Sequence, residues 1–439
     1  MRREIVTLVG RPNVGKSTLF NKITKNRSSI TEDTPGVTRD RLYAKAEWLG
    51  RPFLLVDTGG LDVASDDDFM PEIIEQAEVA IKSSSCVIFI VDGKSGITPT
   101  DKNILQMLRK MNANIILAVN KMDAKNSEDN FYDFYELGAD KMLKISAEHG
   151  IGIGDLLDEV ISYFPNDIVD TNVDGEIKVA LIGKPNVGKS SLLNNILGEK
   201  RAIVTDIAGT TRDSIDTFVN LRDREFRIID TAGLRKKGKI TDLIERFSVI
   251  RTLSAIDEAD VCVLLIDANE GVTEQDTKIM GYAYENNKGL IIAVNKWDMI
   301  EKETDTQRRY VNKIREDLSY VQFAPIVFIS AKTGQRVDVL IHTIIKVYEN
   351  YNKRIPTGVL NDIISDAVLM NTTPQDKGKR LKIYYASQVQ KAPPVISISV
   401  NDTNLTHFSY TRYLENNIRK AFDFEGVPLV FVYKNRGEK

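Results

Sequence analysis

The sequence predicts two consecutive α/β domains, each with a mostly parallel β-sheet and helices on both faces, followed by a smaller α+β domain. Three observations predict this. Apolar strand-like runs alternate with helix-like segments, as is typical of parallel sheets. The segments 10–17 and 183–190 both fit the phosphate-loop pattern G-x-x-x-x-G-K-[S/T], each between an apolar run and a helix-like run. These two loops start 173 residues apart, and further motifs repeat in the same order at similar shifts.

The first copy of the repeat shows the alternation clearly. Its apolar runs, expected to be buried strands, are 5–9, 53–56, 86–91, 115–119 and 142–145. Its helix-like segments are 17–23, 72–82, 101–111, 130–137 and 154–163. Strands that are covered on both faces read as continuous apolar runs, so helices are expected on both sides of this sheet.

The second copy has the same order of elements. Its expected strands are 179–182, 226–229, 261–266, 290–294 and 326–329, with a helix at 190–197. A chain of 439 residues suggests three domains at about 100–200 residues each. We expect a first domain at 1–164, an acidic linker rich in turn formers at 165–176, a second domain at 177–352 and a third at 353–439.

The C-terminal region lacks a phosphate loop and is basic. Its expected α-β-β-α-β elements are 360–370, 380–389, 395–400, 410–422 and 428–433. Of the chain's 59 Lys and Arg and 62 Asp and Glu, 13 and 8 lie from Asn352 onward, which leaves 46 and 54 before it. A basic module on an acidic body indicates a polyanionic partner, although a solvated basic face is an equal alternative. Basic residues near Tyr384 and Tyr385 favour RNA.

The composition indicates a globular cytoplasmic protein. Hydrophobic residues make up 42% and charged residues 28% of the chain, and no apolar run approaches the roughly 20 residues of a membrane span. We expect no signal peptide, because a strand-like run follows the first few residues directly. Cys86 and Cys262 lie in apolar strand-like runs and are expected to be buried thiols. No membrane span is expected, and a monomer is the default.

The phosphate loops carry the strongest chemical signal. Their glycines let the backbone wrap around a phosphate chain, so that successive N–H groups and a helix N-terminus point at the anion. The lysine would reach the β- and γ-phosphates, and the serine hydroxyl would bind Mg²⁺. The expected binding residues are Gly10, Arg11, Pro12, Asn13, Val14, Gly15, Lys16, Ser17 and Thr18, with Gly183, Lys184, Pro185, Asn186, Val187, Gly188, Lys189, Ser190 and Ser191 in the second copy.

A second motif, D-x-x-G, follows a strand in each copy. Its Asp would hold Mg²⁺ and its Gly would present an N–H group to the γ-phosphate. The segments are Asp57, Thr58, Gly59, Gly60 and Leu61, and Asp230, Thr231, Ala232, Gly233 and Leu234. Thr38 and Thr211 lie between the motifs and could complete the Mg²⁺ shell, or could be turn residues. Ser17, Thr38, Asp57, Ser190, Thr211 and Asp230 are thus the expected metal ligands.

A third motif, Asn-Lys-x-Asp, distinguishes guanine from adenine. Its Asp can accept hydrogen bonds from the ring N–H and exocyclic amine of guanine, whereas adenine would leave the carboxylate unpaired. The residues are Asn120, Lys121, Met122 and Asp123, and Asn295, Lys296, Trp297 and Asp298. Ser146 and Ala147, and Ser330 and Ala331, are the expected backbone contacts to the base. The pattern predicts two sites for GTP or GDP rather than an ATPase motor.

These motifs, twice in order and followed by a short basic domain, resemble the Der (EngA) family of bacterial tandem-G-domain GTPases over essentially the whole chain. The resemblance implies a GTP-hydrolysing switch in assembly of the large ribosomal subunit, with that subunit and its rRNA as partners and no role for DNA. It also implies a C-terminal domain of KH-like fold, packed between the G domains. The G-x-x-G loop typical of RNA-clamping KH domains is absent, so shape and phosphate contacts, or docking on the G domains, are expected instead.

One position departs from many small GTPases. The glutamine that orients the attacking water is replaced by Leu61 and Leu234. In related GTPases whose loop reads G-x-P-N-x-G-K-S, the Asn binds K⁺ beside the phosphates, so Asn13 and Asn186 suggest a potassium site; turn chemistry is the alternative. Catalytic roles are expected for Asn13, Lys16, Thr38, Gly60, Asn186, Lys189, Thr211 and Gly233.

Two other functions fit parts of the sequence. A GTPase that assists tRNA modification would carry extra catalytic or helical domains, which this chain lacks. A GTP-binding scaffold that does not hydrolyse would not need two full sets of γ-phosphate-sensing residues.

Overall fold

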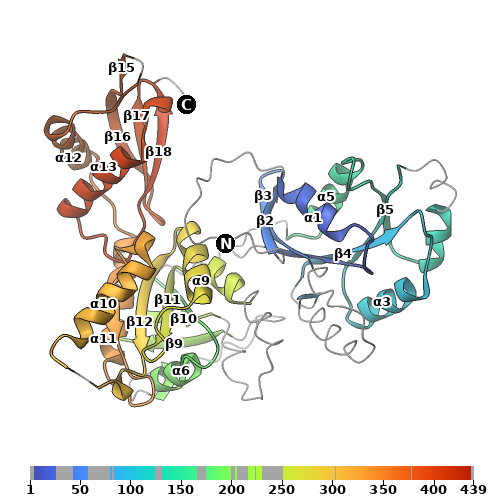
Figure 1. Cartoon of the computed structure of the whole chain (residues 1–439), viewed down its shortest axis with the longest axis horizontal. Helices are drawn as coiled ribbons and strands as arrows, with labels where there is room; N and C mark the ends of the chain where they lie inside the picture. The colour runs from blue at the N-terminus through green and yellow to red at the C-terminus, as the bar shows by residue number, and fades with distance from the viewer. Residues whose placement is uncertain are drawn as a thin grey trace. The chain divides into compact units, whose positions relative to one another are not determined.

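The computed structural model of the chain describes residues 4–25, 43–57, 80–81, 84–123, 131–165, 175–198, 203–204, 216–222, 224–229, 251–301, 303–376 and 378–436. The chain divides into two compact units (Figure 1). One contains the first phosphate-loop domain, and the other contains the second domain together with the C-terminal domain. Among the described residues, no helix is long and apolar enough to cross a membrane.

The first domain is built on a six-stranded sheet. Its elements are β1 (Glu4–Val9), α1 (Lys16–Lys25), β2 (Tyr43–Trp48), β3 (Arg51–Asp57), β4 (Cys86–Asp92), α3 (Pro99–Lys110), β5 (Ile115–Asn120), η3 (Phe134–Leu137), β6 (Lys141–Lys144) and α5 (Ile153–Ser162). The strand order is β2-β3-β1-β4-β5-β6, and every pair is parallel except β2–β3. The strand pattern therefore predicted the parallel core correctly.

Helices pack on both faces of this sheet, as predicted. Leu19 of α1 and Leu156 of α5 share a hydrophobic core with Leu8 of β1. Leu108 of α3 belongs to a separate core with Val9, the next residue of that strand. Successive side chains of a strand point to opposite faces, so these two cores lie on opposite sides of the sheet.

The second domain repeats this topology. Its elements are β7 (Ile177–Ile182), α6 (Lys189–Gly198), β8 (Ile203–Val204), β9 (Thr217–Leu221), β10 (Arg224–Ile228), β11 (Val261–Asp267), α9 (Glu274–Glu285), β12 (Gly289–Asn295), η4 (Trp297–Met299), α10 (Thr306–Asp317), η5 (Ser319–Val321), β13 (Ile326–Phe328) and α11 (Val337–Tyr351). The order β13-β12-β11-β7-β10-β9-β8 matches that of the first sheet, with an added edge strand β8.

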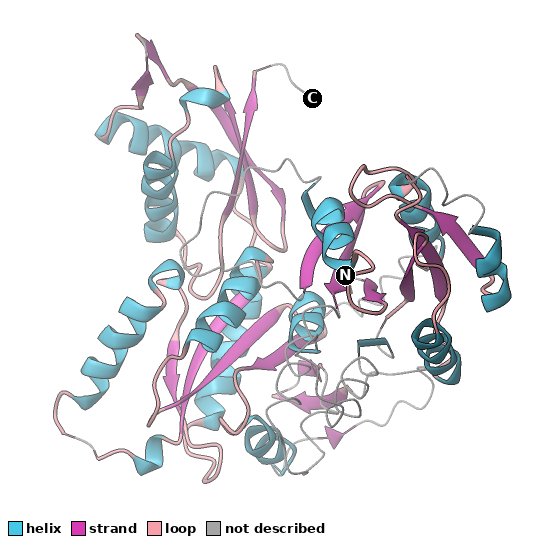
Figure 2. Ribbon diagram, turned by 45° about the vertical axis from the view of Figure 1, so that its right-hand side comes forward, coloured by secondary structure: helices cyan, strands magenta, loops and turns pink. Residues whose placement is uncertain are grey.

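The C-terminal domain is a three-stranded sheet covered by helices. Its elements are α12 (Thr357–Met370), β14 (Gln375–Asp376), β15 (Lys379–Arg380), β16 (Ile383–Gln390), β17 (Val395–Val400), η6 (Thr403–Leu405), α13 (Phe408–Ala421) and β18 (Val430–Asn435). Helices α12 and α13 lie together on one side of strands β16, β17 and β18 (Figures 1 and 2). The α-β-β-α-β order is as predicted.

The second domain and the C-terminal domain share one hydrophobic core, which includes Val347 of α11 and Leu360 of α12. The loop before β18 docks where β12 begins. Leu290 N donates to Gly426 O (2.7 Å), and Gly426 N donates to Phe323 O (2.8 Å). The docking therefore lies at the opposite end of β12 from Asn295, where the nucleotide motif stands.

The structure corrects some element predictions. The residues Phe134–Leu137 form a 3₁₀ turn rather than α-helix, and this turn ends at Gly138 with φ +58°. The expected strand 380–389 is divided into β15 and β16, because the chain changes its pairing partner between them. Arg380 pairs with Gln375 of β14, whereas Ile383 pairs with Val400 of β17. Strands β2 and β9 were not predicted. Cys86 and Cys262 are buried free thiols, as expected, and burial raises the pKa of each to about 12.

Candidate nucleotide sites

Each phosphate loop connects the first parallel strand of its domain to a helix that begins at the motif lysine, Lys16 or Lys189. The second glycine of each motif permits this turn. Gly15 has φ +102° and Gly188 has φ +104°, in the left-handed region that side chains disfavour. A Cβ atom on Gly15 would lie 2.3 Å from Asn120 Nδ2, and one on Gly188 2.2 Å from Asn295 Nδ2. Each phosphate loop can therefore contact the Asn-Lys-x-Asp segment of its domain only because the residue at this turn is a glycine, Gly15 or Gly188.

The motif lysines fold back onto the carbonyl groups of their own loops. Lys16 Nζ donates to Gly10 O (2.6 Å) and Arg11 O (2.9 Å). Lys189 Nζ donates to Gly183 O (2.5 Å) and to Lys184 O (2.7 Å). Burial lowers the pKa of Lys189 to about 8, partly offset by Asp276. Each ammonium group thus lies within the curve of its loop.

In the first domain, two expected metal ligands lie together. Ser17 Oγ at the start of α1 donates to Asp57 Oδ2 at the end of β3 (3.0 Å), and Asp57 is buried. A hydroxyl and a carboxylate oxygen are hard donors of the kind that Mg²⁺ takes alongside phosphate oxygens. The residues therefore fit a Mg²⁺ ion at the phosphate loop. In the second domain, Ser190 stands at the equivalent place in α6.

The asparagine of Asn-Lys-x-Asp holds two loops together. Asn120 Nδ2 donates to Val14 O (2.8 Å), and Asn120 Oδ1 accepts from Ala147 N (2.9 Å). Asn295 makes the same pair of bonds, to Val187 O (2.7 Å) and from Ala331 N (2.8 Å). Both side chains are buried. The sequence predicts that these asparagines belong to the guanine-binding motif. The structure shows that each asparagine links the phosphate loop to the Ser-Ala loop through hydrogen bonds.

The carboxylates predicted to recognise guanine, Asp123 and Asp298, are exposed at the same edge of the sheets. Asp123 Oδ1 accepts from Ser146 Oγ (2.9 Å), and this bond lowers the pKa of Asp123. His149 Nε2 lies 3.5 Å from Asp123 Oδ2. Asp298 follows the buried Trp297, whose ring packs against Phe328 at 4.4 Å between centroids. Ser330, like Ser146, is buried beside its Ala.

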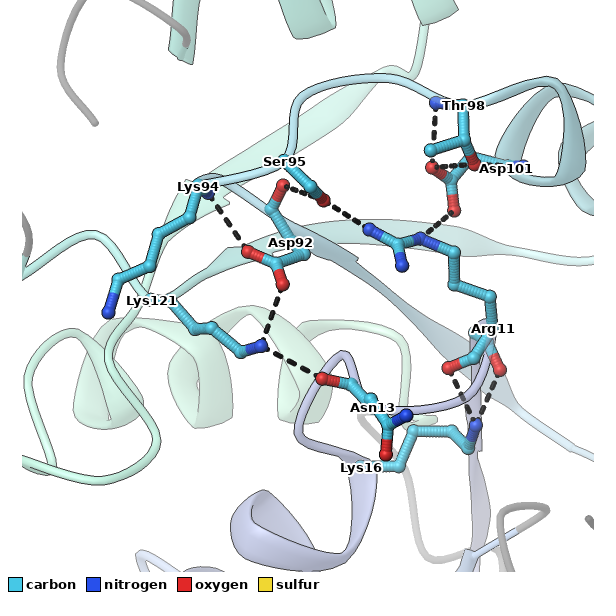
Figure 3. Close-up of polar contacts among 10 residues, drawn as sticks. Arg11, Asn13, Lys16, Asp92, Lys94, Ser95, Thr98, Asp101 and Lys121 are labelled. Carbon is cyan, nitrogen blue, oxygen red and sulfur yellow. Dashed lines mark hydrogen bonds and ion pairs between the residues drawn. The ribbon is translucent and has the colours of Figure 1, made fainter. Parts of the chain in front are cut away.

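The lysine of the motif links two further segments in the first domain. Lys121 Nζ donates to Asn13 O (2.8 Å) and to Asp92 Oδ2 (2.7 Å), so it reaches between the phosphate loop and the end of β4 (Figure 3). In the second domain, Lys296 Nζ lies 2.5 Å from Asp267 Oδ2. Sequence reasoning missed Asp92 and Asp267, although both end apolar runs and stand 175 residues apart, as Asn120 and Asn295 do.

The second residue of each loop makes a different contact in the two domains. Arg11 donates to Ser95 Oγ and pairs with the fully buried Asp101 (Nε to Oδ1, 3.5 Å), which caps α3 (Figure 3). Its counterpart Lys184 pairs instead with the half-exposed Glu270. Both contacts join the phosphate loop to the segment that follows the central strand.

Asn13 and Asn186 adopt left-handed backbone conformations, with φ +65° and +62°. Asn adopts this backbone region more readily than most residues. The shape of the turn is therefore one reason for an Asn at these two positions. Several predicted residues lie outside the described part of the chain. These are Thr38, Thr58, Gly59, Gly60, Leu61, Thr211, Asp230, Thr231, Ala232, Gly233 and Leu234.

Two phosphate loops, each bonded to an Asn-Lys-x-Asp loop at the carboxyl edge of a mostly parallel sheet, define a protein with two GTPase-type P-loop domains. The chain is 55% identical to "GTPase Der" of Caldanaerobacter subterraneus subsp. tengcongensis and to that of Finegoldia magna, in both cases over 100% of each chain. It belongs to the Der family of GTPases, which are GTP hydrolases.

Family models agree with this assignment. The model described as "50S ribosome-binding GTPase" matches residues 5–121 and 178–296. The model described as "KH-domain-like of EngA bacterial GTPase enzymes, C-terminal" matches residues 354–434. The expected KH-like fold of the third domain is thereby confirmed. Among solved structures, a point variant of Aquifex aeolicus Era bound to GDP and AlF4⁻ is 27% identical, covering 60% of this chain and 93% of that chain, with a TM-score of 0.31.

Proposed function

We propose that the chain is a two-site GTP-hydrolysing switch that acts in assembly of the large ribosomal subunit, and that the nucleotide state of the two sites controls domain arrangement and ribosome binding. The observation that carries this proposal is the pair of equivalent phosphate-loop sites, each bonded through a buried asparagine to its guanine-recognition loop. The description of the matching family model, "50S ribosome-binding GTPase", points to the large subunit.

At each site, the backbone of the phosphate loop would bind the phosphates and the exposed Asp123 or Asp298 would bind guanine. Lys16 and Lys189 would exchange the carbonyl groups of their own loops for the oxygens of the anionic phosphates, which bind an ammonium group more strongly than a neutral carbonyl does. Ser17 and Asp57 would hold Mg²⁺, which would neutralise negative charge on the phosphates. In the second domain, Ser190 and Asp230 would have this role.

Hydrolysis would depend on charge stabilisation rather than on a water-orienting glutamine, since Leu61 and Leu234 cannot orient water. We propose that K⁺ bound beside Asn13 and Asn186 offsets the developing negative charge. GTP turnover should then be faster in K⁺ than in Na⁺ at matched ionic strength. Equal rates would remove the potassium site from the proposal and leave the rest standing.

The KH-like domain is the proposed contact to ribosomal RNA. Tyr384 and Tyr385 are about half exposed on β16, and the guanidinium of Arg436 lies 4.8 Å from the centre of the Tyr384 ring. Exposed aromatic rings beside cations suit stacked bases and phosphates. Replacing Arg436 with Ala should weaken binding to the large subunit and reduce its salt dependence.

Co-sedimentation with ribosomal subunits tests this proposal. The wild-type chain would be spun with purified subunits in the presence of GDP or a non-hydrolysable GTP analogue, beside Asp123→Asn and Asp298→Asn. The switch is supported if binding to the large subunit depends on the nucleotide and one of the two variants loses this dependence. The site altered in that variant is then the controlling site. A chain that ignores ribosomes in every state would remove the assembly role. We further propose that the protein works in the cytoplasm as a monomer. Sedimentation of the free chain tests the monomeric state.

A further inference from the structure

Two buried carboxylates beside the nucleotide sites have no part in the function proposed above. Asp92 is the last residue of β4 and Asp267 is the last residue of β11, the central strands of the two sheets. They are 8% and 4% exposed. A buried carboxylate costs free energy unless charged or hydrogen-bonded partners compensate it. The partners of these two residues therefore indicate what they do.

In the first domain, both oxygens of Asp92 are used. Its Oδ1 atom accepts from Lys94 N (2.9 Å), which fixes the carboxylate over the turn after β4. Its Oδ2 atom holds Lys121 Nζ at 2.7 Å. The strand register explains the match, because Asp92 pairs with Asn120 across β4 and β5, directly before this lysine. Burial alone would raise the pKa of Asp92, yet the bonds to Lys121 and Lys94 leave it below its usual value.

The second domain repeats this arrangement with a different turn. Asp267 Oδ1 accepts from Asn269 N (2.9 Å) and Asn269 Nδ2 (3.1 Å), and Oδ2 holds Lys296. Asp267 pairs with Asn295 in the register of β11 and β12. Despite burial, the bonds to Lys296 and Asn269 leave the pKa of Asp267 below its usual value. Two independent copies thus place the same ion pair at the same position.

The lysine in this pair is held in an unusual backbone conformation. Lys121 has φ +66° and Lys296 has φ +61°. Residues other than Gly and Asn adopt this left-handed region only at a cost in free energy. Such a conformation persists where surrounding contacts fix it. In the first domain the ammonium group also bonds to Asn13 O, in the phosphate loop. The lysine therefore stands between the phosphate loop and Asp123, two residues further along.

We propose that Asp92 and Asp267 are positioning residues that fix the motif lysine, and with it the spacing between the phosphate-binding and guanine-binding halves of each site. A nucleotide touches both halves at once, so its affinity depends on that spacing. A carboxylate that holds the lysine before the nucleotide arrives lowers the cost of ordering the site. This inference rests on the proposed binding of guanine nucleotides at these sites.

The test measures the dissociation constant and dissociation rate of a fluorescent GDP analogue with the full-length chain. An Asp298→Asn background limits the readout to the first site. Asp92→Asn keeps the side-chain shape and removes the charge, and we expect it to raise the dissociation constant roughly tenfold, mainly through faster dissociation. Asp92→Glu restores the charge and should recover part of the affinity. Glu136→Gln breaks an exposed ion pair with Lys102 in the same domain and should change nothing.

A double-mutant cycle separates positioning from general stabilisation. If Asp92 acts through Lys121, then Asp92→Asn adds little to Lys121→Met, and the double variant binds as the lysine variant does. Fully additive effects, or an unchanged constant in Asp92→Asn, would overturn the inference. Asp267→Asn in an Asp123→Asn background repeats the test at the second site, should either first-domain variant fail to fold. If the parent chain binds no GDP at the site measured, the proposed function fails there rather than this inference.

Discussion

Replacing Asn120 with Ala should disconnect the phosphate loop from the Ser-Ala loop in the first domain. The substitution removes two hydrogen bonds and leaves Val14 O and Ala147 N without their partner, in residues that are 0% and 1% exposed. An unpaired buried backbone group costs about 1–3 kcal/mol, so the two together cost about 2–6 kcal/mol. Empty loops can move apart and recover part of this cost, whereas a bound nucleotide holds them together.

The lower end of that range, about 2 kcal/mol, corresponds to a roughly 30-fold higher dissociation constant for GDP. Fluorescent GDP titration in an Asp298→Asn background would measure this constant, and thermal unfolding would show that the domain is still folded. Asn114→Ala is the matched control, because it removes a single bond from an exposed Asn to Ser85 O at the opposite end of β5. A folded Asn120→Ala variant that binds GDP within about threefold of its parent would refute the reasoning.

Single contacts support three more predictions. Lys189 carries a charge below its pKa of about 8 and loses it above, so GDP binding at the second site should weaken as pH rises through 8. Titration of an Asp123→Asn chain measures this site, and an affinity that stays constant through pH 8 would contradict the prediction. Gly15→Ala should abolish GDP binding at the first site, because its Cβ atom would lie 2.3 Å from Asn120 Nδ2. Equilibrium dialysis measures the binding, and GDP retained at the first site would contradict the prediction. Gly426 has φ +78°, and a Cβ atom there would lie 2.3 Å from Val347 Cγ2. Gly426→Ala should therefore destabilise the second unit by more than about 1 kcal/mol in thermal unfolding. An unchanged unfolding midpoint would contradict the docking of the C-terminal domain on the second domain.

The parallel strands and the phosphate loops could be predicted because their signals are local. Strands such as β4 and β11 are continuous apolar runs, buried along their whole length. Strand β2 was missed because it is an antiparallel edge strand in which apolar and charged residues mix, and only Ala46 is buried. Its place in the sheet depends on pairing with β3, which the composition of the segment does not reveal.

The roles inside the site were harder to predict, because they depend on contacts between distant segments. Asn120 is 106 residues from Val14, yet its buried side chain bonds to that loop. Asp92 resembles any polar residue at the end of a strand until strand register places it beside Lys121. Arg11 and Lys184 occupy equivalent motif positions, but their partners differ because Ser95 and Glu270 come from loops of different sequence.

The most direct test of the central claim is the number of guanine nucleotides that one chain binds. Isothermal titration of the nucleotide-free chain with GDP should give two sites per chain, with no detectable binding of ADP. Asp123→Asn and Asp298→Asn should each leave one GDP site and gain a site for xanthosine diphosphate, because an amide matches the xanthine edge. A stoichiometry of one GDP in the wild-type chain, or competition by ADP, would contradict an account built on two equivalent guanine sites.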